Sequence, residues 1–193
     1  MSIDKIKAAL KESADLKLKV AEELSRKIFD VATALASCIK SGGKAMFCGN
    51  GGSAADSQHL ATELVVRLTG RFDRAALPAI ALTTDTSMLT ACSNDFGFDY
   101  VFARQIEALG REGDMLFAIS TSGKSPNVIK AVQTAKQKKI LTVGMLGSNG
   151  GDLAAMVDHP LIVPSDNTMR IQEAHIAIGH VIISIVEKDL FSV

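Results

Sequence analysis

The sequence predicts an α/β fold: a doubly wound parallel sheet of about five strands, flanked by helices and preceded by an N-terminal helical pair. Three observations lead to this prediction. Short apolar runs alternate with segments of helical periodicity along the 193 residues. Two of these runs end in glycine-rich or serine-rich turns that precede a helix. The first 40 residues contain neither proline nor glycine. Alternating strands and helices are typical of a parallel sheet covered by helices.

Residues 3–40 are predicted as two helices, or as one broken helix, because apolar residues recur at spacings of three and four. Such a segment has more apolar surface than a small domain needs. We therefore expect part of it to pack against another subunit. The alternative is that it packs only on its own sheet. Ser41-Gly42-Gly43 ends the segment.

The remaining elements follow in chain order. Strands are predicted at 44–48, 77–82, 115–119, 140–146 and 159–163, and helices at 54–66, 88–92, 100–109, 128–139, 152–156 and 169–189. Pro78 places the second strand near a sheet edge or at a strand start. Turn-forming residues predict a loop at 93–99.

Composition narrows the class of protein. Lys plus Arg and Asp plus Glu both number 21, a balance that argues against a nucleic-acid partner or a membrane-surface role. Cys38, Cys48 and Cys92 form no short-spaced pair and are interpreted as free thiols in a reducing compartment. No signal peptide and no bilayer-spanning run is apparent, so we expect a cytoplasmic protein.

A hydroxyl-rich loop follows the apolar run at 115–119. It contains Ser120, Thr121, Ser122 and Ser125, and Pro126 then opens a helix. Free backbone N–H groups and the helix dipole favour an anion at such a position, so we expect a phosphate monoester there. The alternative is a serine-rich turn in which Ser125 acts only as an N-cap. The motif of nucleotide-binding Walker loops is absent.

A second turn of this kind follows the strand at 44–48. It reads Gly49-Asn50-Gly51-Gly52-Ser53 and also opens a helix, and its glycines allow a ligand to approach the backbone closely. Ligands of open α/β sheets lie beyond the carboxyl ends of the strands, where both turns are placed. Asn94 and Asp95 either hold a sugar hydroxyl or simply form a turn.

His59 and Glu63 lie four residues apart and therefore on one helix face. A solvated ion pair is the alternative to a functional pair. His180 lies in a mostly apolar helix, where a histidine is more often a core residue than a catalyst. His159 and His175 are interpreted as structural.

Together these motifs resemble the sugar isomerase (SIS) domain family over essentially the whole chain. The segments that carry the resemblance are C-G-N-G-G-S at 48–53, H-L-A-T-E at 59–63, N-D-F-G-F at 94–98, G-D-x-L-x-x-I-S-T-S-G-x-S at 113–125 and R-I-Q-E-x-H at 170–175, with His180. The resemblance implies one domain over 1–193 and a five-stranded parallel sheet. It also implies a homotetramer with sites at subunit interfaces and with 1–41 at the oligomer interface.

The resemblance further implies a role for each matching residue. The residues that match phosphate-binding positions are Ser120, Thr121, Ser122 and Ser125. Those that match positions contacting the rest of the substrate are Asn50, Gly51, Gly52, Ser53, Glu63, Asn94, Asp95 and Gln172. Glu63 and His180 match the acid/base pair, and His59, Glu63, Gln172 and His180 match the family's zinc positions. Helix geometry alone would align Glu173 with His180, and only the resemblance selects Gln172.

Within the family, the resemblance is to ketose–aldose isomerases that act on sedoheptulose 7-phosphate. It implies proton transfer through an enediol to D-glycero-D-manno-heptose 7-phosphate, the opening step toward ADP-heptose for lipopolysaccharide. One alternative is a non-catalytic SIS protein that binds a replication initiator, and another is an isomerase of a different phosphosugar. A binding protein has no need of Glu63 and His180 in one pocket, so the sequence favours the enzyme.

Overall fold

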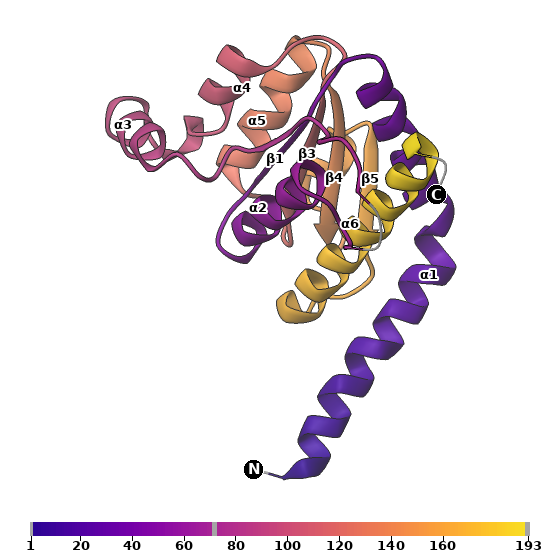
Figure 1. Ribbon diagram of the computed structural model, residues 1–193. Helices are drawn as coiled ribbons and strands as arrows, with labels where there is room; N and C mark the ends of the chain where they lie inside the picture. The colour runs from indigo at the N-terminus through magenta and orange to yellow at the C-terminus, as the bar shows by residue number, and fades with distance from the viewer. Residues whose placement is uncertain (1, 71–72, 192–193) are drawn as a thin grey trace.

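The computed structural model describes residues 2–70 and 73–191, and its centre is a five-stranded parallel sheet. The strands lie in the order β2-β1-β3-β4-β5, and every neighbouring pair is parallel. Their bounds are β1 Ala45–Gly49, β2 Ala79–Ala81, β3 Met115–Ser120, β4 Leu141–Gly147 and β5 His159–Val163. The predicted sheet is confirmed (Figure 1). The edge position expected from Pro78 is also confirmed, because β2 pairs only with β1 and is shorter than predicted.

Helices cover both faces of the sheet. They are α1 Ile3–Lys40, α2 Gly52–Val65, α3 Thr86–Phe96, α4 Ala103–Leu109, α5 Pro126–Gln137 and α6 Thr168–Phe191, with 3₁₀ turns η1 Phe98–Tyr100 and η2 Asp152–Ala155. Phe47 and Phe117 face α1, α2 and α6, and their rings stack at 4.8 Å. Met46 and Leu116 face the opposite layer, which includes α4 and α5. In the chain as far as it is described, no helix is long and apolar enough to cross a bilayer.

The strand order creates a switch point between β1 and β3. From β1 the chain moves to one side to form β2, and it then returns to place β3 on the other side of β1. The loops that leave two such strands diverge, and ligands of open α/β sheets bind in the crevice between them. The glycine-rich turn after β1 and the hydroxyl loop after β3 are the two loops at this point.

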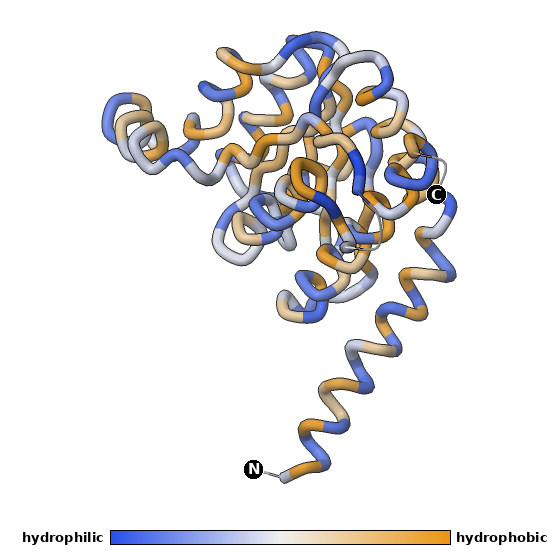
Figure 2. The backbone as a smooth tube through the Cα atoms, viewed as in Figure 1, coloured by the Kyte–Doolittle hydropathy of each residue, from blue (hydrophilic) through white to orange (hydrophobic). Residues whose placement is uncertain are grey.

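Helix α1 is one unbroken helix, which corrects the expectation of two helices or a broken one. Neither proline nor glycine interrupts it, and Lys11–Asp15, Lys19–Glu23 and Arg26–Asp30 form ion pairs between successive turns. Its second half packs on the sheet, whereas its first half projects from the body of the molecule (Figure 1). Figure 2 shows that the projecting half still carries a hydrophobic stripe. Ile3 and Leu10 on this stripe are 70% and 67% exposed.

Helix α3 is longer than predicted and absorbs most of the loop expected at 93–99. The Asp85 side chain caps its start by accepting from the Met88 backbone N–H at 2.9 Å. Gly97, with a φ of +90°, ends it. Asn94 and Asp95 therefore lie in the last helical turn. Residues such as Ser, Asn and Asp are common both in turns and near helix ends. Their presence at 93–96 therefore led to the wrong prediction of a loop.

Candidate active site

The hydroxyls of the loop after β3 lie next to the start of α5. The Ser120 and Ser125 hydroxyls lie 3.2 Å apart, and the Gly123 N–H donates to Ser120 Oγ at 3.1 Å. Ser125 occupies the N-cap position of α5, yet its side chain makes no capping hydrogen bond. The Ser122 hydroxyl accepts from the Lys124 N–H at 3.2 Å. The Ser125 side chain therefore does not cap α5, and the hydroxyl loop precedes the positive end of that helix.

The glycine-rich turn after β1 is tied to this loop by a side-chain pair that the sequence analysis missed. Asn50 Nδ2 donates to Asn127 Oδ1 at 2.9 Å, and Asn127 Nδ2 donates to Asn50 Oδ1 at 2.8 Å. Asn127 is buried in the first turn of α5. Two reciprocal amide bonds thus link the glycine-rich turn to the start of α5 at the switch point.

The turn after β4, which contains Gly150, packs against the hydroxyl loop. Gly123 adopts a φ of +64°, and a Cβ added to it would overlap the Gly150 carbonyl oxygen. The Leu153 N–H donates to the Gly123 carbonyl at 3.1 Å. Only glycine combines this backbone conformation with so close an approach. The path of the hydroxyl loop is therefore set by main-chain packing.

His59, Glu63 and His180 converge between α2 and α6. His59 Nε2 lies 2.8 Å from His180 Nε2 and 3.3 Å from Glu63 Oε1. One ligand atom from each of the three residues falls within 4.8 Å of the others. They line an open cavity of about 500 Å³ together with Leu68, Thr69, Val181 and Ser184. Helical spacing predicted His59 and Glu63 on one face, the family resemblance grouped His180 with them, and the structure brings all three together.

Helices α2 and α6 approach closely because a glycine lies at their contact. A Cβ on Gly179 would overlap the Leu60 side chain, so the neighbouring His180 is brought onto α2. Gln172, two turns earlier on α6, meets the start of α2, since a Cβ on Gly52 would overlap its amide.

Asp56 joins the same stripe of α2, and sequence reasoning missed it. It lies between Gly52 and His59 at helical spacing and is 7% exposed. Burial raises the pKa of its carboxyl, while the Gln172 side chain and the nearby His59 oppose that shift. Its Oδ2 atom lacks a hydrogen-bond partner within 2–70 and 73–191. An aspartate at helical spacing from His59 and Glu63 was the available signal.

Comparison with known proteins places this geometry in a family. The model of the SIS domain matches residues 10–147. The phosphoheptose isomerase of Pelodictyon phaeoclathratiforme is 54% identical over 92% of this chain and 85% of that protein. The phosphoheptose isomerase of Sulfurimonas denitrificans is 50% identical over 96% and 95%. This chain belongs to the phosphoheptose isomerase family of SIS domain proteins. The solved structure of a phosphoheptose isomerase from Francisella tularensis agrees, with a TM-score of 0.93, 39% identity and coverage of 97% and 99%.

The donor set of this SIS domain protein suits zinc. Two imidazole nitrogens and one carboxylate form a common catalytic zinc set, and ligand atoms around a tetrahedral zinc ion lie roughly 3.3 Å apart. The observed separations of 3.3 and 2.8 Å are close to that spacing. Gln172, the fourth residue matched to zinc positions, contacts Gly52, which precedes Glu63 by about 16 Å along α2, so the structure does not bring Gln172 together with the other three residues.

Asn94 and Asp95 lie apart from this cluster in the phosphoheptose isomerase fold. Both are exposed, and the Asn94 amide donates to the Asp95 carboxylate at 2.8 Å. Figure 1 shows α3 standing out from the body of the molecule, away from α6. Their expected contact with substrate stays a prediction.

His175 of this family member is a core residue, as predicted. It is fully buried, and its Nε2 donates to the Leu146 carbonyl at 3.0 Å. Burial lowers the pKa of His175 from 6.5 to about 4, against the smaller opposing effect of that hydrogen bond.

The lowered pKa of His175 predicts a loss of stability in acid. Between pH 6.5 and about 4, the His175 imidazole binds a proton in the unfolded chain but stays neutral in the folded chain. The contribution of His175 is therefore complete above pH 6.5, and about 3 kcal/mol of unfolding free energy is lost as the pH falls to 4. Urea unfolding of the wild type and of His175→Gln at pH 7 and pH 5 measures this. A difference between the two proteins that does not change with pH would contradict the prediction.

Proposed function

We propose that this chain is a ketose–aldose isomerase that converts sedoheptulose 7-phosphate to D-glycero-D-manno-heptose 7-phosphate, the opening step toward ADP-heptose for lipopolysaccharide. The convergence of His59, Glu63 and His180 carries the proposal, since a carboxylate and imidazoles in one cavity suit proton transfer beside a carbonyl. Half-identical relatives named phosphoheptose isomerase support the substrate.

The proposed chemistry divides between the two parts of the site. Ser120, Thr121, Ser122 and Ser125 hold the phosphate with the free N–H groups of α5. Asn50, Gly51, Gly52, Ser53 and Gln172 contact the sugar, with Asn94 and Asp95 near its hydroxyls. Glu63 removes the proton from the carbon beside the carbonyl and returns it to the neighbouring carbon. His180 moves protons between the two oxygens, for which imidazole is suited near neutral pH.

The proposed experiment is direct. The purified protein is incubated with sedoheptulose 7-phosphate, and ¹H and ³¹P NMR follow formation of the aldose. Product formation supports the proposal. Turnover of a shorter phosphosugar alone would instead support an isomerase with another substrate. Absence of turnover with every sugar phosphate, in a protein that still binds inorganic phosphate, would support the non-catalytic alternative.

We also propose zinc as the cofactor, held by His59, Glu63 and His180, while the expected fourth ligand, Gln172, would have to move from Gly52 to reach it. Bound zinc would polarise the substrate oxygens and organise the site. Glu63 has two carboxylate oxygens, so it can serve both as ligand and as base. A chelator is expected to remove activity and zinc to restore it. His59→Gln is expected to weaken zinc binding by about tenfold or more, measured by calorimetry on the apoprotein. Equal zinc affinity in both proteins would remove His59 from the metal site.

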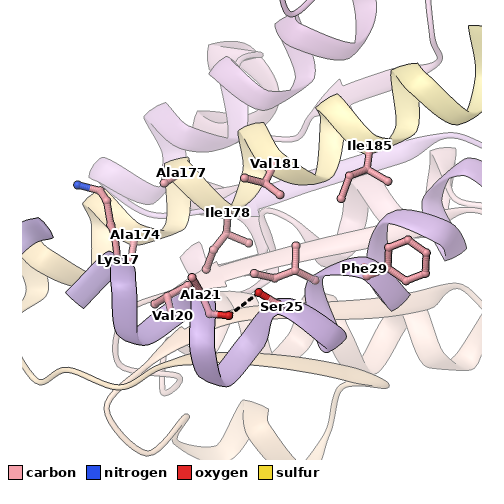
Figure 3. Close-up of a pocket in the computed structure, with 11 residues that line it drawn as sticks. Lys17, Val20, Ala21, Ser25, Phe29, Ala174, Ala177, Ile178, Val181 and Ile185 are labelled. Atoms are coloured by element: carbon pink, nitrogen blue, oxygen red, sulfur yellow. Dashed lines mark hydrogen bonds between the residues drawn. The ribbon is translucent and has the colours of Figure 1, made fainter. Parts of the chain in front are cut away.

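The proposed oligomer is a homotetramer of single-domain subunits spanning 1–193, with residues 1–41 at the interface. An apolar groove between α1 and α6 supports this proposal (Figure 3). Phe29 and Val181 line it and are 51% and 49% exposed, and the stripe at Ile3 and Leu10 is open as well. In such an assembly the exposed end of α3 is available to a site shared between subunits. Light scattering gives the mass, and a monomer at micromolar concentration would overturn the assembly.

The cytoplasmic location rests on cysteine chemistry. Cys38, Cys48 and Cys92 are all free thiols, and burial raises the pKa of Cys48 to about 12. Unpaired cysteines are typical of reducing compartments. Fractionation of the source cells would test the location.

A further inference from the structure

A buried ion pair lies beside the proposed active site. It joins Arg74, in the segment that follows α2, to Glu187 of α6. The Arg74 side chain is 0% exposed and the Glu187 side chain 5% exposed. We propose that Arg74 and Glu187 are positioning residues, which hold Glu63 in register with His180. This inference rests on the proposed function, because it assigns the pair a role in that reaction.

Arg74 binds the end of the helix that carries Glu63. Its Nη2 donates to the Glu63 backbone carbonyl at 2.7 Å, and its Nη1 donates to the Leu64 carbonyl at 2.8 Å. These carbonyls lie in the last turn of α2, where the helix itself supplies too few N–H partners. The guanidinium therefore fixes the main chain of the proposed catalytic base itself.

Glu187 holds that guanidinium from α6. Its Oε1 accepts from Arg74 Nε and, at 3.1 Å, from the Leu68 backbone N–H just beyond α2. The Phe191 ring, one turn further along α6, lies 5.9 Å from Arg74 Cζ. Each of the three guanidinium nitrogens thus has a partner at the junction of the two helices.

Helix geometry places Glu187 and His180 on the same face of α6. Seven residues span nearly two turns, so the two side chains point in directions about 20° apart. One face of α6 therefore contacts α2 at two positions along the helix axis. His180 contacts the His59 side chain, and Glu187 reaches the Glu63 main chain through Arg74. A slip of the end of α2 along α6 would separate Glu63 from His180, and misplacement by about 1 Å can reduce a rate by about 100-fold.

Two conservative variants test the pair. Arg74→Lys keeps the charge but loses the planar fork that binds two carbonyls and a carboxylate together. We expect kcat to fall by about 10- to 100-fold, with inhibition by inorganic phosphate unchanged because the hydroxyl loop lies elsewhere. Glu187→Gln keeps the oxygen acceptor and removes its charge, so a smaller fall in kcat, about threefold to tenfold, is expected.

The matched control is Asp114→Asn. Asp114 forms another ion pair, partly buried, with Lys44 at the amino ends of β1 and β3, and neither residue lines the cavity that holds His59, Glu63 and His180. This variant is expected to lower the melting temperature and to leave kcat within about twofold of wild type. An equal fall in kcat for Asp114→Asn would show that loss of stability alone explains the effect, and the proposal would fail.

Imidazole ¹⁵N NMR supplies a readout without turnover. In Arg74→Lys and Glu187→Gln, the signals of His59 and His180 should shift, and the buried His175 signal should not. Unchanged His59 and His180 signals, or unchanged kcat in both folded variants, would overturn the positioning role. If Arg74→Lys does not fold, the kcat and NMR results for Glu187→Gln alone test the positioning role. A wild type without isomerase activity would refute the proposed function, while the NMR shifts would still test the helix register.

Discussion

Replacing Glu63 by Gln is expected to reduce isomerisation of sedoheptulose 7-phosphate by about 10³-fold or more. The two side chains have nearly the same shape, but an amide oxygen cannot accept a proton from carbon. Glu63 is the carboxylate of the His59–Glu63–His180 cluster, and its side chain is 16% exposed. The rate of aldose formation measured by NMR gives the effect. Activity above a tenth of wild type would remove Glu63 from the chemistry.

Glu173 offers a matched control for this variant. It is a partly buried carboxylate on α6, but it faces α1, where it accepts from Ser13 Oγ at 2.6 Å and pairs with Arg170 at 2.9 Å. Glu173→Gln should keep kcat within about threefold of wild type, since the change affects only the contact with Ser13 of α1 and the pair with Arg170 of α6, neither of which lines the cavity. Unchanged oligomer mass and phosphate inhibition in Glu63→Gln would show that its loss of activity is chemical.

Replacing His180 by Gln is expected to lower kcat by about 100-fold or more, because the amide cannot shuttle protons between the substrate oxygens. His180 Nε2 lies 2.8 Å from His59 Nε2, so the variant also breaks the contact between α6 and α2. Single-turnover measurements separate slow chemistry from slow product release. An undiminished rate would return His180 to the role of a core residue.

His175→Gln distinguishes the two histidines of α6. His175 packs against β4 through the Leu146 carbonyl, on the opposite side from the cavity residues. Its replacement should change stability and leave kcat near the wild-type value. A loss of turnover equal to that of His180→Gln would mean that both variants act through the packing of α6.

Local patterns were sufficient to predict the sheet. The strand at 115–119 is apolar throughout because both faces are covered, and the structure finds each of its residues buried. The positions of the glycine-rich turn and the hydroxyl loop were also predictable, since each joins a buried strand to a helix start, and their binding of an anion stays a prediction. Periodicity could not tell whether the first 40 residues form one helix or two, because a broken and a continuous amphipathic helix share the same pattern.

The missed residues depend on contacts between distant segments. In the sequence, nothing distinguishes Asn127 from other first-turn residues or Arg74 from other charged residues. Their roles come from contacts with Asn50 and Glu187, which lie far away in the chain. The different surroundings of Gln172 and Glu173 likewise depend on packing. Glu173 is taken up by Ser13 of α1, and Gln172 is the side chain that contacts α2 at Gly52. Spacing along one helix carries no information about which neighbour each face will meet.

The glycine contact behind the hydroxyl loop limits how this scaffold can diverge. Gly123 touches Gly150 through main-chain atoms, and neither position has room for a Cβ. Replacement of either glycine therefore cannot adjust the main-chain path of the loop that is proposed to receive the phosphate. A descendant that acquired a longer or shorter sugar would have to change at the helical end, where side chains form the walls.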